Sequence, residues 1–503
     1  MEELTIPQLQ AKMEAGELTA VSLVESYLER IEKIDRQGPS LNAVIELNPD
    51  ALSIAGRLDQ ERQAGKLRGP LHGIPILIKD NIDTHDKMQT CAGSLALAGS
   101  SAPRDAFVVR RLRAAGAILL GKTNLSEWAN FRGKHSVSGW SSRGGLTHNP
   151  YALDRSACGS SSGSGAAVAA GLCAAAVGTE TDGSIICPSQ TNGIVGIKPT
   201  LGLVSRSGII PIAHSQDTAG PMARTVSEAA ILLGAMTGFD GRDPAMQAGR
   251  RRTIRDYRPF LDENGLQGLR IGVARSMAGT DARILKIFEA NLEVMKQLGA
   301  VLVDPVEVPN FKEIGKSEKE VLHFEFKTDL NLYLAGRGSK IKVKTLEDVI
   351  KFNEEHKAQV MPYFGQELML EAQEKGPLTS RKYLRALEKD LRLTRKEGIR
   401  AVMKEHKLDA ITVPSGGPAW MIDLVNGDAI NWDMESTSPA AVAGYPHITV
   451  PAGYIFGLPV GLSFFGRAWS EAILIKAAYA FEQASKVRRE PQFLASADLS
   501  GQI

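Results

Sequence analysis

Cysteine is scarce in this chain, which has only four cysteines among 503 residues, and their spacing is not typical of metal sites or disulfide scaffolds. We therefore expect all four to be reduced and to serve as small buried apolar side chains. The N-terminal segment also lacks the basic start and apolar stretch of a secretory signal, so the sequence predicts a cytoplasmic location. The four cysteines are Cys91, Cys158, Cys173 and Cys187.

The chain also lacks an excess of charge of either sign and a long hydrophobic run. Lys plus Arg total 59 and Asp plus Glu total 57, so no strong field attracts nucleic acid or an anionic membrane surface. The most apolar stretch, residues 165–178, is shorter than the ~18 residues that a membrane-spanning helix needs. We expect no nucleic acid and no membrane as partners, which leaves a small molecule or a peptide as the ligand. The sequence does not fix the oligomeric state, and a monomer is favoured.

What the chain does contain is an alternation of apolar runs and amphipathic segments. Residues 71–78 form an apolar run that predicts a buried strand, and Lys79 follows it; an amphipathic helix at 104–115 then precedes a second buried strand at 117–121. No repeat and no Pro/Ser-rich linker divides the chain, so we predict one large α/β domain. Its expected parts are an N-terminal helical segment (1–70), a core with the catalytic residues (71–250), a helical excursion with a core strand (251–408), and C-terminal strands and a helix (409–503).

Glycine is enriched locally. The chain has 49 glycines, about 10% against a usual value of about 7%. Many lie in residues 132–165, which predict a long loop, and such loops inside compact domains are usually functional. A helix at 166–174 and a strand at 175–179 are expected to follow and to lead into a second glycine turn at 182–184. We expect the functional site at these two turns.

Two simpler interpretations of the first turn stay open. Residues 159–163 match the G-x-S-x-G elbow of α/β-hydrolases, which would make Ser161 a nucleophile, but residues 149–158 contain no apolar run to form the strand before it. The turn could also hold a nucleotide phosphate, although no Gly-Lys-Ser/Thr follows it. A nucleotide-binding module is thus the alternative from a different class.

The nine histidines offer neither a metal-binding pair nor an evident partner for a serine nucleophile. A neutral lysine can serve as the base instead. Keeping a lysine half neutral at pH 7 requires a pKa shift of ~3.4 units, or roughly 4.6 kcal/mol, so the lysine must be well enclosed. Lys79 at the end of its strand is the best-placed candidate, and Lys122 after the second strand is its competitor.

Several spaced motifs together resemble the amidase signature family, from about residue 5 to residue 490. The motifs are residues 73–80 (GIPILIKD), 121–124 (GKTN), 158–165 (CGSSSGSG), 178–184 (GTETDGS), 196–199 (GIKP), 438–446 (SPAAVAGYP) and 457–461 (GLPVG). The resemblance implies an α/β fold with a central mixed β-sheet covered by helices on both faces. It also implies an amidohydrolase that needs no cofactor and no metal.

The resemblance further implies a Ser-cisSer-Lys triad. Ser184 would be the nucleophile, Ser160 the bridging serine after a cis peptide bond, and Lys79 the base. The backbone N–H groups of Thr181, Asp182, Gly183 and Ser184 would form the oxyanion hole. A proton would pass from Ser184 through Ser160 to Lys79 and later reach the leaving amine, while Ser184 forms an acyl-enzyme.

Three positions depart from the common family pattern: Cys158 replaces a glycine, Asp182 replaces Gly or Ala, and Ile186 replaces Arg. These departures argue against the tRNA-dependent amidotransferases of the family and against generic amidases. Residues 181–188, 215–218 and 324–330 are instead similar to the peptide amidase branch, which hydrolyses the C-terminal carboxamide of peptides and releases ammonia. A broad-specificity aliphatic or aryl amidase is the alternative within the family.

Residues 124–131 correspond to pocket-lining sequence in the family. Trp128 and Phe131 are candidates for substrate contact, although each is also a normal core residue. Asn130 is polar and lies between apolar neighbours, so it is the better candidate for the pocket.

Overall fold

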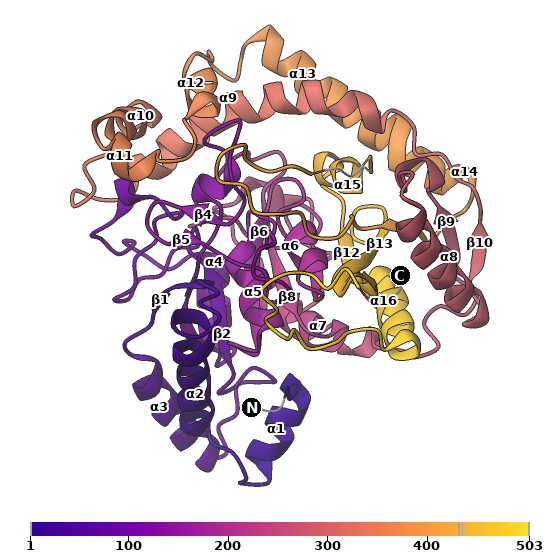
Figure 1. Cartoon of the computed structure of the whole chain (residues 1–503), viewed down its shortest axis with the longest axis horizontal. Helices are drawn as coiled ribbons and strands as arrows, with labels where there is room; N and C mark the ends of the chain where they lie inside the picture. Colours follow the sequence, from indigo (N-terminus) through magenta and orange to yellow (C-terminus); the bar gives the residue numbers. More distant parts are fainter. Residues whose placement is uncertain (1–2, 431–432, 435, 501–503) are drawn as a thin grey trace.

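The computed structural model describes residues 3–430, 433–434 and 436–500, and it is built around one large mixed β-sheet (Figure 1). The sheet has 11 strands in the order β1-β3-β2-β6-β8-β7-β12-β13-β11-β9-β10. Its strands are β1 (Val44–Leu47), β2 (Pro75–Lys79), β3 (Ile118–Thr123), β6 (Ala175–Glu180), β7 (Val195–Lys198), β8 (Thr218–Ala223), β9 (Arg270–Val273), β10 (Val301–Val303), β11 (Ala410–Pro414), β12 (His447–Ile455) and β13 (Leu458–Phe465). The expected α/β fold with a central mixed sheet is confirmed. A separate ribbon joins β4 (Trp140–Ser141) and β5 (Gly145–Leu146).

The strands that carry the predicted motifs lie next to one another. β2 pairs in parallel with both β3 and β6, and β6 continues antiparallel to β8. Every residue of β2, β3 and β6 is buried, because helices cover both faces of a sheet whose strands are continuous apolar runs. The carboxyl ends of these parallel strands therefore bring Lys79, Lys122 and the turn after β6 to one edge of the sheet.

Helices flank this sheet in several groups (Figure 1). At the N-terminal end, Thr5 and Thr19 each cap a helix with a capping box, and the helix after Thr19 buries Ala20, Leu23, Val24 and Tyr27. The helices are α1 (Ile6–Glu14), α2 (Ala20–Arg30), α3 (Ala51–Gln63), α4 (Phe107–Ala114), α5 (Ser162–Ala169), α6 (Ile186–Thr191), α7 (Val226–Met236), α8 (Ala282–Gln297), α9 (Ile314–Ala335), α10 (Leu346–Glu355), α11 (Lys357–Val360), α12 (Glu367–Gln373), α13 (Arg381–Leu391), α14 (Arg400–Glu405), α15 (Ser438–Ala443) and α16 (Glu471–Ser485). No helix among the described residues is both long and apolar enough to cross a membrane.

The helical excursion arches over one side of the sheet. Figure 1 shows α9 and α13 running side by side, with α10 to α12 grouped at one end of α9. The sequence predicts continuous helix from 381 to 406, but the helix widens to a π-type turn at Arg392–Ile399, where Gly398 leaves helical geometry. Glycine's lack of a side chain permits that break.

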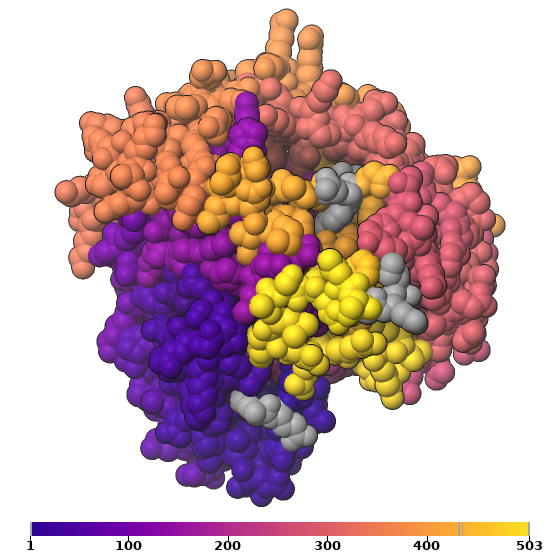
Figure 2. All heavy atoms as spheres, in the orientation of Figure 1, coloured from indigo at the N-terminus to yellow at the C-terminus, as the bar shows by residue number. Residues whose placement is uncertain are grey.

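The N-terminal and C-terminal segments contact each other on the surface. Figure 2 shows the C-terminal residues lying across the face of the molecule near the N-terminal segment. Arg488 forms an ion pair with Glu3, and the N–H of Phe493 donates to the carbonyl of Pro150 at 3.0 Å. The C-terminal strands β12 and β13 also lie inside the same sheet as β2 and β6, so the first and last parts of the chain share one core. The four segment boundaries given by the sequence stay a prediction.

Candidate active site

A cavity of about 340 Å³ opens at the edge of the sheet where β6 ends. It lies between the two glycine turns, the segment after β3 and the loop that precedes α15. Its lining includes Asn130, Phe131, Gly159, Asp182, Gly183, Ser184 and Thr437. The structure thus brings the turn with Ser184 together with two of the three residues that the sequence proposed for a pocket.

Ser184 lies in the short turn between β6 and α6. Glu180, the last residue of β6, accepts hydrogen bonds from the backbone N–H groups of Ile185 at 2.7 Å and Ile186 at 3.0 Å. Gly183 has a φ of +76°, a conformation that favours glycine. The carboxylate therefore fixes the turn from its far side while the glycine allows the tight reversal.

The first glycine turn passes close to Ser184. The peptide bond between Gly159 and Ser160 is cis, as the family resemblance predicts. The N–H of Ser161 donates to the carbonyl of Ser184 at 3.2 Å, and the N–H of Ser126 donates to the carbonyl of Ser160 at 3.1 Å. These backbone bonds hold Ser160 between the strand-end residues and the turn that carries Ser184.

Lys79 reaches this turn from the end of β2. Its fully buried ammonium nitrogen lies 2.7 Å from Ser160 Oγ, 2.9 Å from Thr179 Oγ1 and 3.1 Å from Ser161 Oγ. Among the described residues no carboxylate forms an ion pair with it, and burial lowers the pKa of Lys79 to about 7, opposed by the more distant Glu180 and Asp217. The side chain can therefore be neutral near pH 7, which is what a base requires.

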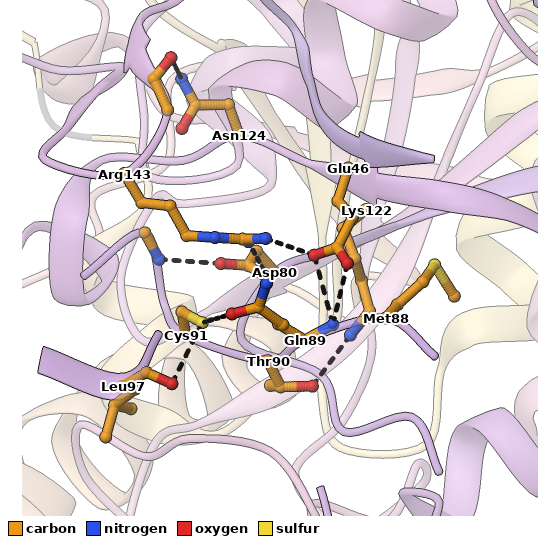
Figure 3. A network of polar contacts seen from close by, with 12 residues as sticks. Glu46, Asp80, Met88, Gln89, Thr90, Cys91, Leu97, Lys122, Asn124 and Arg143 are labelled. Atoms are coloured by element: carbon orange, nitrogen blue, oxygen red, sulfur yellow. Dashed lines mark hydrogen bonds and ion pairs between the residues drawn. The ribbon is translucent and has the colours of Figure 1, made fainter. Parts of the chain in front are cut away.

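Lys122, the competing candidate, points to a different environment (Figure 3). Its nitrogen donates to the carbonyl of Ile82 and, at 3.0 Å, to Thr90 Oγ1. Burial lowers the pKa of Lys122, whereas the nearby carboxylates of Asp80 and Asp83 favour its charged form. Neither serine turn contributes a partner to this lysine in the part of the chain that the structure describes.

The prediction that all four cysteines are reduced is wrong for two of them. Cys158 and Cys187 form a disulfide, while Cys91 and Cys173 are free and buried as expected. The two bonded residues are 29 positions apart in the chain, but folding brings their Cα atoms to 6.1 Å because Cys158 precedes Ser160 and Cys187 follows Ser184 on turns that meet. Disulfides persist in oxidising compartments, so this pair removes the cysteine argument for a reducing one.

The geometry of the two glycine turns bears on both the predicted oxyanion hole and the elbow interpretation of Ser161. Within the described ranges, the backbone N–H groups of Asp182, Gly183 and Ser184 have no protein acceptor, so they are free to bind a developing oxyanion. Ser161 is instead fully buried, and its Oγ donates to the carbonyl of Thr179 at 3.0 Å. Ser161 does not line the cavity, and its turn follows no buried strand, so the geometry does not favour the elbow.

The three pocket candidates occupy different positions. Trp128 is 1% exposed and packs in the core beside the cavity rather than lining it. Phe131 lines the cavity and stacks against Phe326 with ring centroids 4.8 Å apart. Asn130 also lines the cavity, and its buried Oδ1 has no protein donor among the described residues, so it can accept a hydrogen bond from a ligand.

Some residues at the site carry no sequence signal. Asp428 lines the cavity and accepts hydrogen bonds from Ser138 Oγ at 2.6 Å and Trp420 Nε1 at 3.0 Å. Asp428 and Ser138 are 290 positions apart in the chain, so their contact can be seen only in the folded structure. Glu180 could have been noticed, since a carboxylate at the end of an apolar strand needs buried donors.

One cluster of potential metal ligands occurs among the described residues, outside this cavity. It consists of His214, Glu325 and Asp329, whose ligand atoms lie within 4.8 Å of one another. Each ring nitrogen of His214 faces a different carboxylate, Nδ1 toward Asp329 at 2.8 Å and Nε2 toward Glu325 at 3.4 Å. This arrangement suits an imidazolium between two carboxylates, and both neighbours raise the pKa of His214 against the effect of burial.

The fold and this site define an amidase: the Amidase family model matches residues 22–475, and the chain belongs to that family. The native peptide amidase of Stenotrophomonas maltophilia is 51% identical, with a TM-score of 0.93 over 98% of this chain and 99% of that one. A probable amidase of Arabidopsis thaliana is 41% identical over 98% of this chain and 92% of that protein. A putative amidase of Schizosaccharomyces pombe is 38% identical over 98% of this chain and 87% of that protein.

Proposed function

We propose that this amidase hydrolyses the C-terminal carboxamide of peptides through an acyl-enzyme on Ser184. The observation that carries the proposal is the contact between the Lys79 amine and Ser160 Oγ at 2.7 Å, in a buried site where the lysine can lose its proton near pH 7. A lysine that faces hydroxyl groups instead of carboxylates is suited to proton transfer rather than to ion pairing.

In this mechanism the neutral Lys79 amine takes a proton from Ser160, and Ser160 takes the proton of Ser184 as Ser184 Oγ attacks the amide carbon. The N–H groups of Thr181, Asp182, Gly183 and Ser184 stabilise the tetrahedral oxyanion. The proton returns through Ser160 to the leaving nitrogen, and ammonia departs. A water molecule then attacks the acyl-enzyme by the same route, releasing the carboxylate and restoring Ser184.

Two observations favour a peptide amide over other amides. The cavity of about 340 Å³ is lined by the apolar Phe131 and by Asn130, whose Oδ1 can accept a hydrogen bond from a peptide N–H group. The relative in Stenotrophomonas maltophilia is named a peptide amidase and shares about half of its residues with this chain. A broad aliphatic or aryl amidase is the second candidate, supported by the 41% identity to a probable amidase of plant origin. No metal and no cofactor has a step in this mechanism.

The test is ammonia release from three sets of substrates: peptide amides, free amino-acid amides, and aliphatic or aryl amides. Peptide amides should have the highest kcat/KM, and Ser184→Ala should lower kcat by at least ~10⁴-fold because the covalent step is lost. Equal kcat/KM for all three sets would favour the broad amidase. Saturable nucleotide binding without ammonia release from any amide would instead support the nucleotide-binding module.

A further inference from the structure

Asp182, in the turn that precedes Ser184, has an incomplete set of hydrogen bonds. Its Oδ2 accepts a hydrogen bond from Ser438 Oγ at the start of α15. Its Oδ1 is buried and, as far as the structure describes the chain, has no donor from an N–H group or a hydroxyl. A buried carboxylate oxygen without a donor is costly, so a donor is expected next to it.

A second carboxyl lies against that of Asp182. Glu318 of α9 is 8% exposed, and its carboxyl lies in hydrogen-bonding contact with that of Asp182. Gln216 fixes Glu318 in place, because its Nε2 lies 2.9 Å from Glu318 Oε1 and 3.2 Å from the carbonyl of Thr181. Gln216 thus connects the oxyanion turn to the helical excursion at the same point where the two carboxyl groups meet.

Two carboxylates in contact repel each other, and neither can donate a hydrogen bond. We propose that Glu318 carries a proton and donates it in a hydrogen bond to Asp182 Oδ1, which makes Glu318 a positioning residue for the oxyanion turn. The inference rests on the proposed function, in which the N–H groups of residues 181–184 bind the oxyanion. Glu318 contacts no substrate and acts through Asp182.

The charged groups around the pair are consistent with a bound proton. Burial and the charge of Asp182 raise the pKa of Glu318 well above its usual range, and Asp390 of α13 raises it further. Gln216 from the loop before β8 is neutral, and the hydrogen bond that it donates to Glu318 opposes this rise in pKa without supplying a charge. Lys198 of β7 lies within electrostatic range of Asp182 but donates to the carbonyl of Tyr445, and among the described residues no cation forms an ion pair with either carboxyl. A proton is therefore the positive charge available to the pair.

The pH dependence follows from the sign of each shift. In the proposal Glu318 carries its proton while the enzyme works. Since its pKa is raised, it loses the proton only as the pH rises through the folded-state value, after which Asp182 loses its donor and the two groups repel. Lys79, with a pKa near 7, must lose its proton to act as a base. Activity should therefore rise through about pH 7 as Lys79 is deprotonated, and fall at higher pH as Glu318 is deprotonated.

The experiment compares pH profiles of kcat for the full chain and the variants Glu318→Gln, Glu318→Ala and Glu325→Gln. Glutamine supplies a permanent N–H donor, so Glu318→Gln should keep kcat near the original value at pH 7, keep the acid limb, and move the alkaline limb up by more than about one pH unit. Glu318→Ala should lower kcat at every pH, by up to about 10²-fold, because the turn loses its support. Glu325 is a buried carboxyl of the same helix without contact to Asp182, so Glu325→Gln should leave the alkaline limb in place.

An alkaline limb that is the same in Glu318→Gln and the original protein would overturn the proposal, and so would an unchanged kcat in Glu318→Ala. The pH dependence of Tm gives a second measurement that does not need activity: the fall in Tm at alkaline pH should be smaller in Glu318→Gln than in Glu325→Gln. If the original protein releases no ammonia from any amide, the proposed function fails, while the Tm comparison still decides whether Glu318 carries the proton.

Discussion

Two fully buried lysines end adjacent parallel strands of the sheet, and they differ in what surrounds them. In the register of β2 and β3, Lys79 pairs with Thr123 and Ile78 pairs with Lys122, so the two lysine side chains lie on opposite faces of the sheet. On one face Lys79 contacts the hydroxyl groups of Ser160 and Thr179. On the other face Lys122 shares its surroundings with Asp80, which Arg143 also contacts at 3.3 Å (Figure 3).

The comparison shows that burial alone does not make a lysine a base. Burial lowers the pKa of both residues, but the carboxylates beside Lys122 favour its ammonium form, and that charge is useful for holding the loop around Thr90. Among the residues that the structure describes, Lys79 has only hydroxyl and carbonyl partners, which accept its hydrogen bonds without stabilising a charge as strongly. On one face of the sheet the buried lysine thus lies among carboxylates, and on the other it lies among hydroxyl groups, which is the arrangement that the proposed proton transfer requires.

The strongest way to test this comparison is to replace each lysine by methionine, which is similar in size and uncharged. Lys79→Met should lower kcat by about 10⁴-fold or more while Tm stays the same or rises, because a buried amine with a lowered pKa destabilises the folded state below its unfolded pKa. Ammonia release and thermal unfolding measure the two effects.

Lys122→Met is the matched control and should show the reverse. The folded fraction should keep its kcat, whereas the free energy of unfolding should fall by roughly 3 kcal/mol or more, because two buried acceptors lose their donor at about 1–3 kcal/mol each. If Lys122→Met abolished turnover of folded protein and Lys79→Met did not, the assignment of the base would be reversed.

The disulfide extends the comparison, because it joins the two glycine turns near Lys79, whereas Ile82 and Thr90, which contact Lys122, take no part in it. Replacing Cys158 and Cys187 together by alanine should lower the free energy of unfolding by about 2–4 kcal/mol, because the bond closes a loop of 29 residues. Denaturant unfolding measures the change, and dithiothreitol should have the same effect on the original protein.

Cys91→Ala serves as the control, because Cys91 is free and lies in the network around Lys122. Dithiothreitol should lower the stability of Cys91→Ala as much as that of the original protein, and should have no effect on the double variant. A double variant as stable as the original would contradict the role given to the bond.

The smallest expected effect is that of Ser161→Ala. Ser161 Oγ bonds to the carbonyl of Thr179 and lies 3.1 Å from the Lys79 nitrogen, so its loss removes one of several partners of the lysine. We expect kcat to fall by less than about tenfold and stability by about 1–2 kcal/mol. The comparison with Ser184→Ala is decisive: a larger loss of kcat in Ser161→Ala would restore the elbow interpretation.

Much of the fold is accessible from the sequence because its signals are local. The apolar run before Lys79 appears in the structure as the expected buried strand, β2. The start of α5 differs, since the sequence predicts it at residue 166 and the helix begins at Ser162. Serine and glycine are poor helix formers, but a Cβ on Gly163 would lie 2.3 Å from the carbonyl oxygen of Ala43, so close packing selects these small residues and overrides propensity.

The candidate site also contains some residues that sequence motifs predict and others that only folding brings together. Ser184, Ser160 and Lys79 stand in recognisable motifs, and the structure places Lys79 against Ser160 and the turn of Ser184 beside both. No sequence motif predicts that Asp428 contacts Ser138 or that Glu318 contacts Asp182. In each pair the two residues are more than 100 positions apart in the chain. Trp128 lies in the core, where an aromatic residue is as well suited as in a pocket.

The amino-acid sequence by itself determined the α/β character of this protein, the buried strand before Lys79 and the family motifs that contain the candidate site residues, because hydrophobic period and motif spacing act over a few neighbouring residues. Only the tertiary structure decided which buried lysine meets hydroxyl groups, which cysteines are joined, and which carboxyl groups lie against each other. Those properties depend on burial and on partners distant in the chain, and the free energies that set a pKa or bring two sulfur atoms together arise only when the sheet and its loops have assembled.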